Sequence, residues 1–122
     1  MPITAKQQPP YYEQGSWPKI YKAIINQTGT NAPTAIILKN TYPTFPQWTY
    51  DGVGEYILIM PTGTLNYNKT TIEYSGNESA AWIQSSENDV DELYFSTALA
   101  SNSNTLANDL LRHVTITITQ YL

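Results

Sequence analysis

Cysteine is absent from the 122 residues of this chain. This absence excludes disulfide bonds, thiolate catalysis and zinc sites built from cysteine. Basic residues are also scarce, with six Lys and Arg against ten Asp and Glu, which gives a net charge of -4. A nucleic-acid-binding protein needs clustered basic side chains to neutralise phosphates, and an acidic protein is repelled by an anionic membrane surface. We therefore expect neither nucleic acid nor a membrane as a partner.

Long apolar runs are missing as well. No stretch approaches the roughly 20 apolar residues that a membrane-spanning helix needs, and residues 1–6 begin no run of signal-peptide length. The composition therefore indicates a protein that is made in the cytoplasm without a secretion signal of its own.

Aromatic and β-branched residues are what the sequence has in abundance. It contains ten Tyr and three Trp, and hydrophobic residues make up 41% of the chain, whereas charged residues make up only 13%. Disordered chains lack such apolar content, so a folded protein is expected. The length fits one domain.

Short strands separated by turns are predicted from residue 19 onward. The clearest covers residues 114–119, where Val114, Ile116 and Ile118 alternate with three Thr residues, the pattern of a half-buried strand. Asp51-Gly52 is a hairpin-type turn signal. The expected strands are residues 19–28, 34–41, 47–50, 54–60, 68–74, 80–85, 92–97 and 114–119.

This spacing predicts an all-β fold. About eight strands at intervals of roughly 8–12 residues are typical of a sandwich or a barrel. We expect a single jelly-roll-like β-sandwich over residues 19–122, with the strand order left open. Residues 86–89 are predicted to form a loop. Residues 99–111 are ambiguous, and the spacing of their Leu residues allows a short helical turn.

The Thr residues of the last strand define one outward face. Thr115, Thr117 and Thr119 are uncharged and suit a strand through their branched Cβ atoms. Such a row either faces solvent or lies against another subunit, and the sequence leaves both open.

The first 18 residues differ from the rest. They are rich in Pro and Gln and have no hydrophobic periodicity, and proline favours extended backbone. Residues 1–18 are interpreted either as a tail or as an extended arm that lies on a neighbouring subunit. The candidate subunit contacts in such an arm are Pro9, Pro10, Tyr11, Tyr12 and Trp17.

Catalytic chemistry is not expected. His113 is the single histidine, at the start of the last strand, and no Gly-x-Ser-x-Gly elbow is present. A pair of carboxylates across a cleft is not excluded by sequence, but a chain this short leaves little room for both a core and a cleft. Residues 87–92 are the densest acidic run, but they lack the glycine and spacing of a calcium-binding loop, which favours a solvated loop. No catalytic residue, metal site or cofactor is predicted.

The aromatic residues exceed what a small core needs. Trp48 and Trp82 lie in predicted strands and are the best core candidates. Exposed Tyr and Trp side chains favour recognition, because they combine apolar area with a polar tip. They would stack on sugar rings or seal a subunit interface.

One set of residues resembles a known group of proteins. The resemblance covers most of residues 21–121 and departs from the group at the end, where Thr115 to Tyr121 replace a strand of the type acid-Ile-Arg-Val-Tyr. The most specific block is Tyr21-x-Ala23-Ile24-Ile25-x-Gln27-Thr28-Gly29-Thr30-x-Ala32-Pro33. On these residues the chain is similar to small β-rich virion-associated proteins of bacteriophages.

The resemblance implies a virion context without catalytic residues. We expect a bacteriophage virion structural protein, a capsid decoration or cement protein or a component of a fibre or spike. It would be made in the host cytoplasm, form a homo-oligomer, with a trimer favoured, and contact other capsid or tail proteins. The alternative is a carbohydrate- or receptor-binding module that uses exposed Tyr and Trp on a host surface glycan. A small hydrolase is the third hypothesis.

Overall fold

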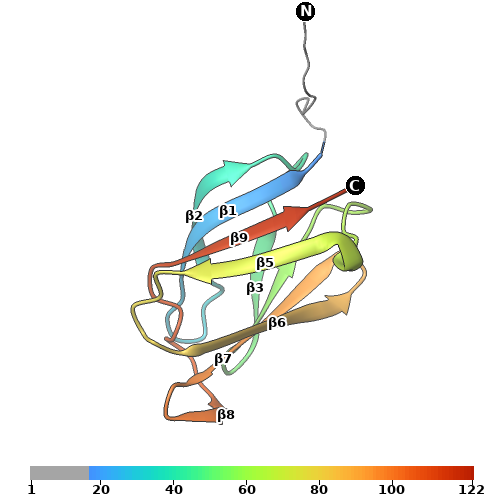
Figure 1. The fold of residues 1–122 in the computed structure, drawn as a ribbon. Coiled ribbons are helices and arrows are strands. Elements are labelled where there is room, and N and C mark those ends of the chain that lie inside the picture. Colours follow the sequence, from blue (N-terminus) through green and yellow to red (C-terminus); the bar gives the residue numbers. More distant parts are fainter. Residues whose placement is uncertain (1–16) are drawn as a thin grey trace, which may run out of the picture.

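The computed structural model describes residues 17–122, which form two antiparallel sheets (Figure 1). Sheet A has the order β2 (Thr34–Asn40), β1 (Lys19–Asn26), β9 (Val114–Gln120) and β5 (Thr70–Ser75). Sheet B has the order β3 (Gln47–Gly52), β4 (Glu55–Ile59), β7 (Glu92–Leu99) and β6 (Trp82–Asp89), and β8 (Asn102–Leu106) pairs with β7. A 3-10 turn, η1 (Tyr67–Lys69), precedes β5. The predicted all-β sandwich is confirmed, and residues 17–122 contain nine strands where about eight are predicted.

The core lies between the inner faces of the two sheets. The alternation in β9 holds, because Val114, Ile116 and Ile118 are fully buried while the intervening Thr residues face outward. Sheet B contributes Tyr56 and Phe95, which are also fully buried. Burial of one such side chain stabilises a fold by about 1.5–3 kcal/mol, so the period-two pattern determines which face of each strand turns inward.

The strand directions gather the connecting loops at two opposite ends of the sandwich (Figure 1). We call the end that carries Trp17, residues 41–46 and the chain end the N-terminal pole. We call the other end the β8 pole; it carries residues 27–33, 53–54, 76–81 and 100–113.

A buried glutamine closes the core near each pole. Gln27 is 3% exposed, and its Oε1 accepts hydrogen bonds from the Tyr56 hydroxyl at 2.7 Å and from Asp109 N at 2.9 Å. At the N-terminal pole, Gln120 is 1% exposed and accepts from the Tyr42 hydroxyl at 2.9 Å. Buried amides are stable only when they are hydrogen-bonded, so these contacts make polar side chains compatible with the core.

Two predictions of local structure are wrong, and the helical turn left open for residues 99–111 does not form. Residues 86–89 are not a loop, because β6 continues to Asp89 and pairs with β7, with Glu87 opposite Leu93. Backbone pairing needs no apolar side chain at positions that face solvent. Residues 99–111 form no helical turn, since β8 lies within them. The turn predicted at Asp51-Gly52 lies instead at residues 53–54.

Candidate functional site

The outer face of sheet A carries the Thr row of β9 at its centre. Thr117 pairs with Lys22 of β1 on one side and with Glu73 of β5 on the other. Neighbouring strands lie about 4.8 Å apart, so a basic and an acidic side chain flank a small hydroxyl across the sheet. Lys22 and Glu73 are both exposed, and Thr117 is partly exposed.

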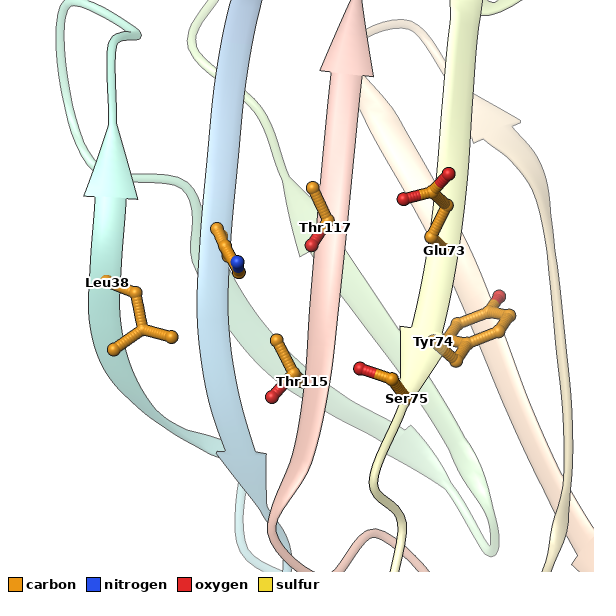
Figure 2. A pocket seen from close by; sticks show the side chains of 7 residues that line it. Leu38, Glu73, Tyr74, Ser75, Thr115 and Thr117 are labelled. Carbon is orange, nitrogen blue, oxygen red and sulfur yellow. The ribbon is translucent and has the colours of Figure 1, made fainter.

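The outer face of sheet A has a depression over its short Thr side chains. A depression of about 580 Å³ runs over β9, because the Thr side chains are shorter than those of Lys22, Leu38 and Glu73 on the flanking strands. Figure 2 shows Leu38, Thr117 and Glu73 projecting from three strands around it. Its lining residues are Lys22, Leu38, Glu73, Tyr74, Ser75, Thr115 and Thr117.

The β2 side of this face is apolar. Ile36 is 60% exposed and Leu38 is 51% exposed, on a strand that forms the edge of sheet A. Ile24, partly exposed on β1, lies opposite Ile36. An edge strand offers unpaired backbone groups, and native proteins usually protect such edges with charge. Exposed aliphatic side chains here favour contact with another protein surface.

The outer face of sheet B is aromatic and acidic. Tyr94 lies at its centre, opposite Ile57 and near Glu55. Partial burial, together with a hydrogen bond to the Glu55 carboxylate, raises the pKa of Tyr94. The phenol therefore remains a neutral hydrogen-bond donor over the ordinary pH range.

The two strand tryptophans have different environments. Trp48 packs on Phe95 with ring centroids 4.9 Å apart, and its Nε1 donates to the Tyr21 hydroxyl at 3.1 Å. Its predicted role in the core is confirmed. The same prediction for Trp82 is wrong, because that residue is 55% exposed. Trp82 lies on the outward phase of β6, whereas Ile83 faces the core.

The acidic run contains a structural carboxylate. Asp91 has φ +58° and accepts hydrogen bonds from Gly63 N at 2.7 Å and from Leu65 N at 3.1 Å. Its backbone carbonyl accepts from Met60 N at 2.8 Å. Asp91 therefore holds the segment that follows β4 in place. The run is a strand end followed by a tight turn, so the predicted loop is wrong, whereas residues 87–90 are exposed to solvent as predicted.

The single histidine makes a backbone contact at the β8 pole. His113 is exposed, and its backbone N donates to Asn26 Oδ1 at 2.8 Å. Within residues 17–122 no group of three or more His, Cys, Asp or Glu side chains is placed to hold a metal ion. No helix in the same residues is long and apolar enough to cross a membrane.

Most of the predicted subunit contacts cannot be placed. Pro9, Pro10, Tyr11 and Tyr12 lie outside the described residues. Trp17 lies at the N-terminal pole, partly buried, with Lys19 Nζ 5.0 Å from the centre of its ring.

The sequence interpretation missed the β8 pole. Every residue from Leu99 to Leu106 is exposed, and this segment lies next to Trp82. A signal was present, because no residue from 93 to 108 is charged and Ser, Asn and Thr dominate residues 101–105.

Comparison with known proteins yields no relative: no family model, curated protein or solved structure matches this chain.

Proposed function

We propose that this protein is a structural subunit of a bacteriophage virion, a capsid decoration or cement protein or a component of a fibre or spike. It acts by contact with neighbouring subunits and with capsid or tail proteins. The observation that carries the proposal is the outer face of sheet A, where exposed Ile36 and Leu38 adjoin an uncharged row of Thr. Enzymatic activity is no part of the proposal.

The Thr row supports packing against another protein. A Thr hydroxyl both donates and accepts hydrogen bonds, so it makes contacts without an isolated buried charge. Apolar side chains beside it supply the area whose removal from water stabilises an interface, about 25 cal/mol per Å² before the costs of association.

The sandwich architecture is compatible with this role but does not define it, because one fold serves many functions. The predicted jelly roll is one kind of sandwich. In the observed order, the hairpins β1–β2, β3–β4 and β6–β7 each lie within one sheet, and the proposed role does not require a jelly roll.

In this proposal residues 1–18 act as an arm that ties neighbouring subunits together. The chain enters the sandwich at the N-terminal pole, beside the start of β1. An arm that starts there leaves the β8 pole free. We expect a homotrimer, with a solution mass near three times 13.7 kDa by light scattering. Deletion of the arm should weaken attachment to the virion and leave the sandwich folded.

The test first asks whether the protein is present on purified virions. It then alters the outer face of sheet A by substitution. Leu38→Glu should reduce its recovery with gradient-purified virions, because it introduces a charge into the apolar contact. Ile59→Glu is the matched control, since Ile59 is 40% exposed on sheet B. Absence of the unmodified protein from virions would refute the proposal. Equal loss with both variants would argue against sheet A as the contact.

A second candidate is a carbohydrate- or receptor-binding module. The exposed indole of Trp82 supports it, because an aromatic ring on a sheet surface is suited to stacking on a ligand. A spike or fibre tip would combine both functions.

A further inference from the structure

The β7–β8 hairpin forms the far end of the β8 pole. Among residues 17–122, β8 pairs only with β7, at the end of the molecule opposite the start of β1 (Figure 1). All of its residues are exposed, as are Leu99 to Ser101 before it. A strand that buries none of its side chains adds little to the core, so the stability of the sandwich does not explain this segment.

The chemistry of the hairpin is polar and neutral. Residues 101–105 are Ser-Asn-Ser-Asn-Thr, within a segment that carries no charge from residue 93 to residue 108. Hydroxyl and amide groups both donate and accept hydrogen bonds. Ser and Asn supply adaptable hydrogen bonding at many recognition surfaces, and Trp supplies rigid contact area.

Trp82 provides such contact area beside the hairpin. Its Nε1 donates to the carbonyl of Ala100 at 3.3 Å, which holds the indole against the start of the turn. Ala98, 5% exposed, lies opposite Trp82 on one side and opposite Leu106 on the other. Trp82, Ala98 and Leu106 thus form a single apolar strip across three strands.

The loops around this strip contain unusual backbone conformations. Ala80, Asp109 and His113 have φ of 55°, 66° and 56°, and all belong to connections of the β8 pole. Positive φ costs a non-glycine residue about 1–2 kcal/mol. Such positions cluster at functional sites, where the surrounding structure maintains them. Ala80 comes two residues before Trp82 and so helps to direct the chain that presents it.

We propose that Trp82 and the β7–β8 hairpin form a binding site for an uncharged glycan. A sugar ring has an apolar face of C–H groups, which fits an exposed indole, and a rim of hydroxyls, which need both donors and acceptors. The Ser and Asn side chains supply both. A sulfated or sialylated glycan would need basic partners, which residues 93–108 lack. The inference deepens the binding-module candidate and does not depend on virion attachment.

The test uses the full-length protein on a printed array of neutral, sialylated and sulfated oligosaccharides. We expect binding to neutral oligosaccharides, with a change in tryptophan fluorescence on titration of the best of them. Trp82→Ala should weaken this binding about tenfold or more, as for other aromatic contacts of this kind. Phe45→Ala is the matched control, because Phe45 is 58% exposed at the opposite pole; it should leave the affinity unchanged.

A second variant addresses the hairpin separately. Asn104→Asp introduces a charge without changing the size of the side chain, and it should weaken binding while the melting temperature stays the same. The inference is overturned if no neutral oligosaccharide binds, if only charged glycans or proteins bind, or if Trp82→Ala binds as the unmodified protein does. A protein that attaches to virions but binds no neutral glycan would overturn only this inference. A protein that binds a neutral glycan but is absent from virions would overturn only the structural role.

Discussion

The Tyr56 hydroxyl donates a 2.7 Å hydrogen bond to Oε1 of Gln27, although Tyr56 lies in sheet B and Gln27 directly follows β1 of sheet A. The Nε2 of the same amide donates to the carbonyls of Gly29 and Asn31, at 2.8 and 3.1 Å. One buried side chain thus joins sheet B to the loop that follows β1, at the base of the β8 pole.

Loss of this contact should destabilise the protein. Tyr56→Phe leaves the ring in the core but removes a donor from a buried acceptor, and we expect a loss of about 1–2 kcal/mol in the free energy of unfolding. Urea denaturation measures it. Tyr121→Phe, at a residue that is 52% exposed, is the control. Equal stability of both variants would mean that water replaces the Tyr56 hydroxyl.

Alkaline pH should weaken the fold through the same tyrosine. Burial raises the pKa of Tyr56 from 10.0 to about 12, and burial also raises the pKa of Tyr42. Because the folded-state pKa lies above the unfolded value, the stabilisation is fully present below about pH 10 and is lost as the pH rises towards about 12. Thermal melting across this interval should show the fall, and Tyr56→Phe should make it less steep. A flat profile in the unmodified protein would contradict the prediction.

Gly54 should not tolerate alanine. Its φ is +68°, and an added Cβ would lie 2.7 Å from both Ala107 N and Thr97 O. Backbone strain and overpacking together should cost about 2–5 kcal/mol. Gly63 also has positive φ, +77°, but has nothing within 4 Å of an added Cβ, so Gly63→Ala should cost only about 1–2 kcal/mol. Chemical denaturation of both variants separates the cost of the steric contact at Gly54 from the cost of positive φ that both positions share.

Asp91 should stabilise the loop that follows β4. Asp91→Ala removes both side-chain hydrogen bonds and places alanine at positive φ, so we expect a loss of about 1–3 kcal/mol. Asp91→Asn keeps one carbonyl oxygen and tolerates this backbone, and it should lose less. Hydrogen exchange at Gly63 and Leu65 reports the effect locally, and unchanged exchange in Asp91→Ala would show that the carboxylate does not hold the loop.

Calcium should leave the protein unchanged. Both carboxylate oxygens of Asp91 already accept backbone N–H groups, so the acidic run offers few free ligands near the turn. A ligand that binds the folded state raises the melting temperature. Millimolar calcium should therefore produce no shift, and a clear rise would identify a cation site in residues 87–92.

The class of the fold and most of its strands follow from local sequence patterns. Alternation in residues 114–119 predicts one buried face, and the structure buries Val114, Ile116 and Ile118, since apolar burial acts on each strand locally. A local pattern is enough to predict the buried face of a strand, because burial depends on the side chains of that one segment and their contact with water.

Which surfaces the strands present depends on how distant segments pair in the folded chain. Trp82 is predicted to be a core residue from the sequence, but the register of β6 against β7 turns it outward. A one-residue change of register would exchange the two faces of the strand. Polarity suggested a loop at residues 86–89, yet pairing with β7 makes them a strand. Register and pairing depend on residues far apart in the chain. The Lys22–Thr117–Glu73 row and the strip from Trp82 to Leu106 therefore appear only when the sheets have assembled.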